Sequence, residues 1–163
     1  MEAKDYTWLR SQLRRISRRW PPIYEALANA KQPYIGDNKR KKWMYKCAEC
    51  GNTFDNKDVM VDHINPCGAL KEKSDIATFV LKLFCEADEL QVLCKECHDV
   101  KSYAERYGMT LEEASLEKTV IAFGKLSAAA QIKMLKDLKL TSAPTKEKRL
   151  IVYREYLKGE VNV

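Results

Sequence analysis

The segment from Cys47 to Lys101 decides the architecture of this 163-residue chain, because it gathers the residues that can carry chemistry. It contains two Cys-x-x-Cys pairs, an Asp-His dipeptide between them, and both histidines of the sequence. Its decisive pieces read Cys47-Ala-Glu-Cys50-Gly51, Val61-Asp62-His63-Ile64-Asn65-Pro66 and Leu90-Gln91-Val92-Leu93-Cys94-Lys95-Glu96-Cys97-His98. This density of ligating side chains predicts a metal centre around which the rest of the chain is arranged.

The paired cysteines predict a structural zinc site. Each pair can chelate from a turn, and one ion would then close the loop of 43 residues that separates the pairs. The four predicted ligands are Cys47, Cys50, Cys94 and Cys97. Cys67 and Cys85 lack paired spacing, so we expect them to be small buried apolar residues.

Asp62, His63 and His98 predict a second, catalytic centre. Neighbouring side chains of a strand point to opposite faces, so Asp62 and His63 can share one ion only if the strand ends or bends there. One carboxylate and one imidazole can bind a divalent cation, with the other imidazole left as a base. The alternative interpretation makes both histidines zinc ligands or hydrogen-bonded polar residues.

The combined motif resembles the zinc-containing branch of the HNH endonucleases, which have a ββα-metal fold. The match covers roughly a third of the chain, and the Cys67-Gly68-Ala69-Leu70 stretch resembles phage-encoded members. The resemblance implies that Asp62 and His98 bind the catalytic ion, which is Mg²⁺, Mn²⁺ or another divalent ion, and that His63 deprotonates water. It also implies that Lys101 contacts phosphate and that DNA is cut or nicked to leave 5′-phosphate ends.

The sequence departs from this family at Glu89. The family usually has asparagine before the Leu-Gln-x-Leu-Cys run, where it helps to orient the base histidine. A carboxylate can accept the imidazole Nδ1–H, although it cannot donate a hydrogen bond as an amide can. Glu89 is therefore included among the candidate catalytic residues.

The net charge of +6 is unevenly distributed along the chain. Residues 1–46 contain 12 Lys and Arg against 4 Asp and Glu, whereas the remainder contains 17 basic and 19 acidic residues. A basic arm beside a nearly neutral body predicts a polyanionic partner, most simply DNA. The predicted phosphate contacts outside the motif are Arg14, Arg15, Arg18, Arg19, Lys39, Arg40, Lys41 and Lys42.

The whole chain is predicted to be α+β, mainly helical around a small zinc-stapled ββα module. We divide it into a basic helical arm (1–42), the metal module (43–107) and a helical region (108–163). Helices are expected at residues 4–20, 22–30, 74–85 and 94–107, a linker at 31–42, and a β-hairpin at 43–62. In the last region Thr110 with Glu113 fits a capping box, and Ser127 is expected to cap the following helix. Apolar stripes there suit a core or a homodimer contact, and the sequence alone leaves both readings open.

Composition also bears on location and partners. No apolar run is long enough to span a bilayer, and the N-terminus lacks the apolar core of a secretory signal. We therefore expect a cytoplasmic protein, in the host cytoplasm if the chain is phage-encoded, with no membrane association and a phage or host protein as a further partner. Two alternatives to a nuclease are a zinc-stabilised DNA-binding or assembly module without catalysis and a purely structural helical protein. The basic arm disfavours the second.

Overall fold

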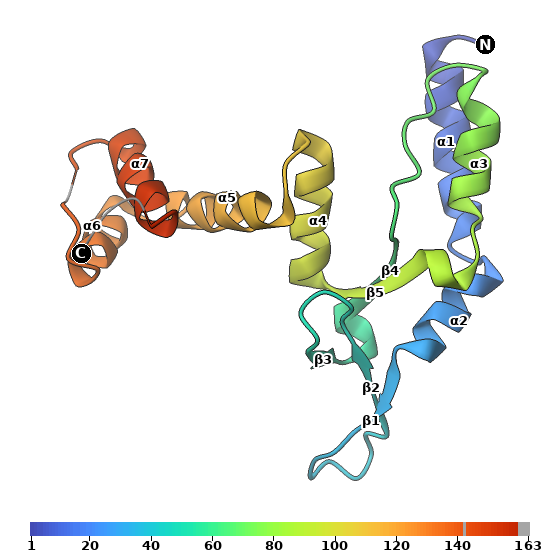
Figure 1. Ribbon diagram of the computed structural model, residues 1–163, viewed down its shortest axis with the longest axis horizontal. Coiled ribbons are helices and arrows are strands. Elements are labelled where there is room, and N and C mark those ends of the chain that lie inside the picture. The colour runs from blue at the N-terminus through green and yellow to red at the C-terminus, as the bar shows by residue number, and fades with distance from the viewer. Residues whose placement is uncertain (142, 160–163) are drawn as a thin grey trace. The chain divides into compact units, whose positions relative to one another are not determined.

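The computed structural model describes residues 1–141 and 143–159, which contain seven α-helices and two small β-sheets (Figure 1). The α+β class predicted from the sequence is confirmed. The chain divides into two compact units, unit 1 (Met1–Asp99) and unit 2 (Val100–Val163). The three regions predicted from the sequence were defined by charge and motif content, whereas these two units are defined by compactness. The three-region division therefore stays a prediction.

The first sheet of unit 1 has the strand order β1-β2-β3, with β1 at Lys31–Pro33, β2 at Trp43–Lys46 and β3 at Thr53–Phe54. The linker expected at 31–42 therefore begins as a strand. This strand escapes detection because its three residues are all exposed, so backbone pairing with β2 holds it and no apolar alternation marks it.

The second sheet pairs β4 (Val59–His63) antiparallel with β5 (Leu90–Cys94). The hairpin predicted at 43–62 is thus only partly correct, since β2 pairs with β3 and the last stretch pairs with a strand much later in the sequence. Local pattern cannot reveal this partner, because the pairing is between distant segments. Short 3-10 turns precede both strands, at Asn56–Asp58 and Ala87–Glu89.

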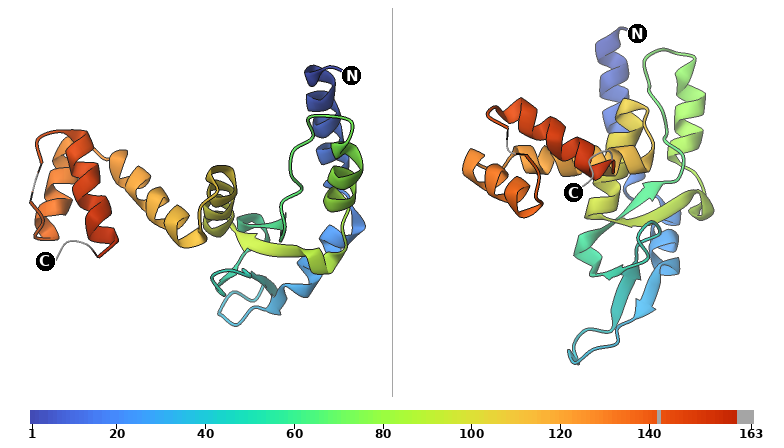
Figure 2. Two further views of the ribbon diagram at one scale, coloured as in Figure 1. Left: turned by 45° about the horizontal axis from the view of Figure 1, so that its top comes forward. Right: turned by 60° about the vertical axis from the view of Figure 1, so that its left-hand side comes forward.

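Helices α1 (Ala3–Ser17) and α3 (Asp75–Leu83) run side by side in Figures 1 and 2. Tyr6 of α1 is buried against Phe79 and Leu83 of α3, which makes the larger apolar cluster of this unit. Cys67 joins the same cluster, and Cys85 is buried in the cluster beneath α2 (Pro21–Asn29), as expected for isolated cysteines. The prolines at 21 and 22 open α2, because proline suits the first turn of a helix.

Helix α4 (Lys95–Tyr107) begins at the residue after β5. The order β4, β5, α4 therefore places two paired strands directly before a helix. The central chemistry-bearing segment of the sequence is distributed over these three elements and the knuckle that precedes them.

Unit 2 contains α5 (Leu111–Gly124), α6 (Ala128–Asp137) and α7 (Lys146–Leu157). The predicted caps are confirmed: Thr110 and Glu113 form a capping box, and Ser127 accepts from the Ala130 N–H. The apolar stripes meet in one internal cluster that includes Val120, Leu135 and Tyr153. Core packing thus accounts for the faces that the sequence had left open, and the homodimer contact stays a prediction.

No helix among the described residues is long and apolar enough to cross a membrane.

Leu135→Ala is expected to destabilise unit 2 selectively. Leu135 is fully buried, so its truncation should cost about 2–5 kcal/mol. All three tryptophans lie in unit 1, at positions 8, 20 and 43, so their fluorescence reports that unit alone. The urea transition followed by far-ultraviolet circular dichroism should therefore move, for the unit 2 part of the signal, to lower urea concentration. The transition followed by tryptophan fluorescence should keep its midpoint. Ile132→Ala on the same helix, at a position that is 40% exposed, is the matched control and should change little.

Candidate metal centre and the adjoining histidines

The four predicted zinc ligands form one cluster. The sulfur atoms of Cys47, Cys50, Cys94 and Cys97 all lie within 4.8 Å of one another. Tetrahedral zinc with thiolate ligands at about 2.3 Å places its sulfurs about 3.8 Å apart, so a small adjustment would seat such an ion. Among residues 1–141 and 143–159, no other three His, Cys, Asp or Glu ligand atoms gather in this way.

The first cysteine pair is shaped by a tight turn after β2. The Gly51 N–H donates to the Cys47 carbonyl at 3.0 Å, and the Cys47 N–H donates to the Asn52 carbonyl at 2.8 Å. Gly51 has φ of +72°, a left-handed conformation that favours glycine. The Ala48 N–H donates to the Val92 carbonyl at 2.8 Å, which attaches this knuckle to β5.

The second pair lies where β5 passes into α4. The Cys94 N–H donates to Cys47 Sγ at 3.3 Å, and the Cys97 N–H donates to Cys94 Sγ at 3.5 Å. Such backbone donors stabilise a thiolate. The hydrogen bonds therefore join the two pairs and prepare the sulfurs for a cation.

Electrostatics favours a cation at this position. Burial tends to raise the pKa of the Cys47 thiol, but the backbone N–H groups of Cys50, Cys94 and Glu49 lower that pKa to about 7. Burial raises the pKa of Cys94, and burial together with the neighbouring thiols raises that of Cys97. A thiolate forms readily at Cys47, whereas Cys94 and Cys97 resist ionisation because they are buried and because like charges this close repel. A divalent ion would remove that conflict.

Asp62 and His63 end β4 on opposite faces. In the register of the second sheet Asp62 lies opposite Gln91, and His63 lies opposite Leu90. The alternation of side chains places Asp62 on the face of Leu93, which packs against Cys47 of the cysteine cluster. His63 takes the other face, because the strand stays regular up to its last residue.

The imidazole of His63 contacts the end of α3. Its Nε2 lies 3.1 Å from the Leu83 carbonyl oxygen. A carbonyl can only accept, so this contact favours a proton on Nε2. His63 also lines a cavity of about 280 Å³ together with Asn65, Pro66, Lys82, Cys85 and Glu89.

Glu89 shares that cavity and closes the turn before β5. Its carbonyl accepts from the Ile64 N–H at 2.9 Å, and its carboxylate accepts from the Glu86 N–H at 3.4 Å. The first bond joins the residue after His63 to the residue before Leu90, and the second closes the turn. The predicted effect of the Glu89 carboxylate on the imidazole stays a prediction.

His98 lies in the first turn of α4, one residue after the last cluster cysteine. Its side chain is partly exposed, and its Nδ1 lies 4.0 Å from the Asp99 carboxylate. His98 thus directly follows the cysteine cluster, and the Leu93 side chain connects that cluster to the sheet face of Asp62. Further along the same helix, Lys101 forms an ion pair with Glu105.

Of the Lys and Arg side chains predicted to contact phosphate, some are exposed and others form ion pairs within the protein. Lys41 forms an ion pair with Asp55 and lies over the Tyr34 ring, so part of its charge is used within the protein. The others outside α4 are exposed: Arg14, Arg15, Arg18, Arg19, Lys39, Arg40 and Lys42.

Sequence reasoning missed two residues of the His63 cavity, Lys82 and Cys85. Both lie near the end of α3, far from His63 in the sequence. No local motif marks them. They become neighbours of His63 only through the tertiary contact between the end of α3 and the end of β4.

Comparison of the chain with protein-family models, with curated proteins and with solved structures finds no match. The structure by itself shows an α+β fold and a cluster of four cysteines that could hold a metal ion such as zinc.

The purified chain is expected to retain about one equivalent of a thiol-binding metal ion such as zinc. Cys94→Ser should abolish retention, and acidification should release the ion, because protons compete with the metal for the thiolates. Cys85→Ser, at a buried cysteine outside the cluster, is the matched control and should retain it. Elemental analysis after gel filtration measures both. Metal-free wild type would contradict the four-cysteine assignment.

Proposed function

We propose that this protein is a metal-dependent DNA endonuclease of the HNH type, with structural zinc in the cysteine cluster. The element order β4, β5, α4 is the observation that carries the proposal. A strand ending in Asp62-His63 pairs with the strand that ends in Cys94, and the helix with His98 begins at the next residue. This order would suit a ββα-metal module closed by a structural ion.

Asp62 and His98 would hold a catalytic Mg²⁺, Mn²⁺ or related ion. The donor set fits, since one carboxylate and one imidazole leave most coordination positions to water and phosphate oxygens, as such ions prefer. Both side chains are partly exposed, and His98 directly follows the last cysteine of the cluster. The ion, when bound, would act as a Lewis acid on the scissile phosphate and the leaving oxygen.

His63 would act as the general base. The Leu83 carbonyl selects the tautomer in which Nε2 carries the proton, so Nδ1 would accept a proton from the attacking water. The cavity beside the ring gives that water and the phosphate a place to enter. Orientation of the imidazole by a backbone carbonyl also lessens the need for asparagine at position 89.

The exposed basic side chains of unit 1 would hold the DNA backbone. The arginines at the end of α1 and directly after it, together with the cations before β2, would supply affinity and salt dependence without sequence choice. Lys101 would contact phosphate once DNA competes with Glu105 for its charge.

The second candidate is a zinc-stabilised DNA-binding or assembly module without catalysis. Glu89 in place of the motif asparagine is the observation that favours it. The two candidates share the cysteine cluster and the basic surface. They differ in whether Asp62, His63 and His98 are needed for anything beyond folding.

Purified protein is expected to nick or cut plasmid DNA in the presence of Mg²⁺ or Mn²⁺. His63→Ala should slow cleavage by roughly 10²- to 10⁴-fold, the range of a general base. Asp62→Asn should also lose cleavage, whereas Asp58→Asn, at an exposed carboxylate before the same strand, should not.

Retention of zinc and of tryptophan fluorescence shows that each variant is folded. Cleavage by His63→Ala at the wild-type rate would refute the catalytic assignment. DNA binding without cleavage under any divalent ion would select the non-catalytic module.

The salt dependence of DNA binding tests the predicted backbone contacts. Each lost phosphate contact lowers the slope of log Kobs against log salt by about 0.9. The triple variant Lys39→Ala, Arg40→Ala, Lys42→Ala should therefore lower the slope by up to about 2.7. The charge-matched control replaces Lys133, Lys136 and Lys139, which are exposed in unit 2. An equal loss in the control would show that non-specific charge accounts for the effect.

A further inference from the structure

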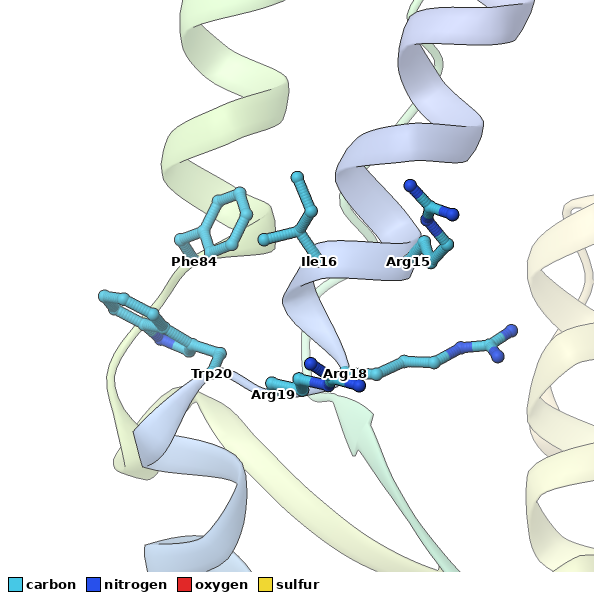
Figure 3. Close-up of a pocket in the computed structure, with 6 residues that line it drawn as sticks. All are labelled: Arg15, Ile16, Arg18, Arg19, Trp20 and Phe84. Carbon is cyan, nitrogen blue, oxygen red and sulfur yellow. The ribbon is translucent and has the colours of Figure 1, made fainter.

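A second hollow of unit 1 lies between the end of α1 and the end of α3. It has a volume of about 600 Å³ and is lined by Arg15, Ile16, Arg18, Arg19, Trp20 and Phe84 (Figure 3). In Figure 3 the apolar side chains of Phe84, Ile16 and Trp20 lie on one side, and Arg15 and Arg18 extend on the other. The hollow therefore joins an apolar wall to a cationic one.

The apolar wall is rigid and aromatic. The Trp20 Nε1–H donates to the Cys85 carbonyl at 2.7 Å, which fixes the indole. The rings of Trp20 and Phe84 meet edge to face with their centroids 5.4 Å apart. Ile16 adds an apolar side chain that is 58% exposed. Solvent-facing apolar groups held this firmly can receive a flat ligand at little entropic cost.

The cationic wall is not neutralised by any carboxylate of the described residues. In the described part of the chain, no carboxylate forms an ion pair with Arg15, Arg18 or Arg19. The sequence from Tyr6 to Tyr24 contains no acidic residue. These exposed guanidinium groups therefore present unneutralised charge and planar hydrogen-bond donors, which suit phosphate.

The hollow is connected to His63 through one short segment, Leu83–Cys85. The Leu83 carbonyl contacts the His63 ring, Phe84 forms part of the hollow, and Cys85 lines the His63 cavity while its carbonyl holds Trp20. Consecutive residues are about 3.8 Å apart at their Cα atoms, so the two sites adjoin each other.

We propose that this hollow binds an unpaired nucleotide of DNA, with the base against Trp20 and Phe84 and the phosphates against the arginines. A flat apolar group joined to repeated negative charge is what the two walls together recognise, and in a paired duplex the base faces are stacked and unavailable. This proposal rests on the proposed function and specifies its substrate: DNA in which a single-stranded segment adjoins a duplex, cut beside the junction.

Binding is tested in the His63→Ala background without added divalent ions, so that cleavage plays no part. The probes are a labelled duplex and the same duplex with a short single-stranded extension. The chain is expected to prefer the extended DNA. Trp20→Phe and Ile16→Ala should each reduce that preference, and Phe84→Ala should weaken binding of extended DNA by roughly 5- to 150-fold, the range of one lost stacking contact, with little effect on the plain duplex.

Trp8→Phe is the matched control, because Trp8 is 65% exposed on α1 and does not line the hollow. Single-stranded DNA should quench tryptophan fluorescence in Trp8→Phe and quench it much less in Trp20→Phe. Equal affinity of the parent protein for both probes would overturn the proposal, as would equal losses on both probes in the hollow variants. Displacement of the extended DNA by anionic lipid vesicles would overturn it in favour of a membrane surface.

These outcomes separate the two proposals. If plasmid cleavage is absent but extended DNA binds through Trp20 and Phe84, the hollow stands and the nuclease assignment fails. If His63-dependent cleavage occurs with no preference for unpaired nucleotides, the nuclease proposal is supported and the proposal of a nucleotide site in the hollow is refuted.

Discussion

Four thiol groups within 4.8 Å of one another form the constraint on which the centre of unit 1 depends. They come from the knuckle after β2 and from the junction of β5 with α4, so satisfying them together holds distant segments in place. Backbone donors favour the thiolate of Cys47, whereas burial and the neighbouring thiols oppose ionisation of Cys97, which is why a cation suits the position. The same junction determines where α4 begins, and thereby where His98 lies.

The end of α3 is the second organising element of the unit. Residues Leu83 to Cys85 contact His63 through a carbonyl, hold Trp20 through another, and place Phe84 in the arginine-lined hollow. The same short segment therefore contacts both His63 and the arginine-lined hollow, which lie far apart in the sequence. In the proposed nuclease, the base and the site for an unpaired nucleotide would be positioned by the same three residues, so substrate placement and chemistry would be coupled.

The accuracy of the sequence-based predictions follows the range of the interactions involved. The caps at Thr110 and Ser127 and the cysteine pairs were found because their partners lie within a few residues. Strand β1 and the pairing of β4 with β5 were missed, since neither leaves a local trace. Lys41 was assigned to DNA alone, although Asp55 in a later turn pairs with it.

The sequence by itself determined the ligand types, their spacing, the basic N-terminal arm and the α+β class, because chelation, charge and helical periodicity are written in neighbouring residues. Tertiary structure alone decided that Asp62 and His63 end on opposite faces of the second sheet, and that the His63 ring contacts a carbonyl of α3. The contact between the rings of Phe84 and Trp20 also exists only in the tertiary structure. These depend on contacts between segments many residues apart, whose register is set by packing of the whole unit.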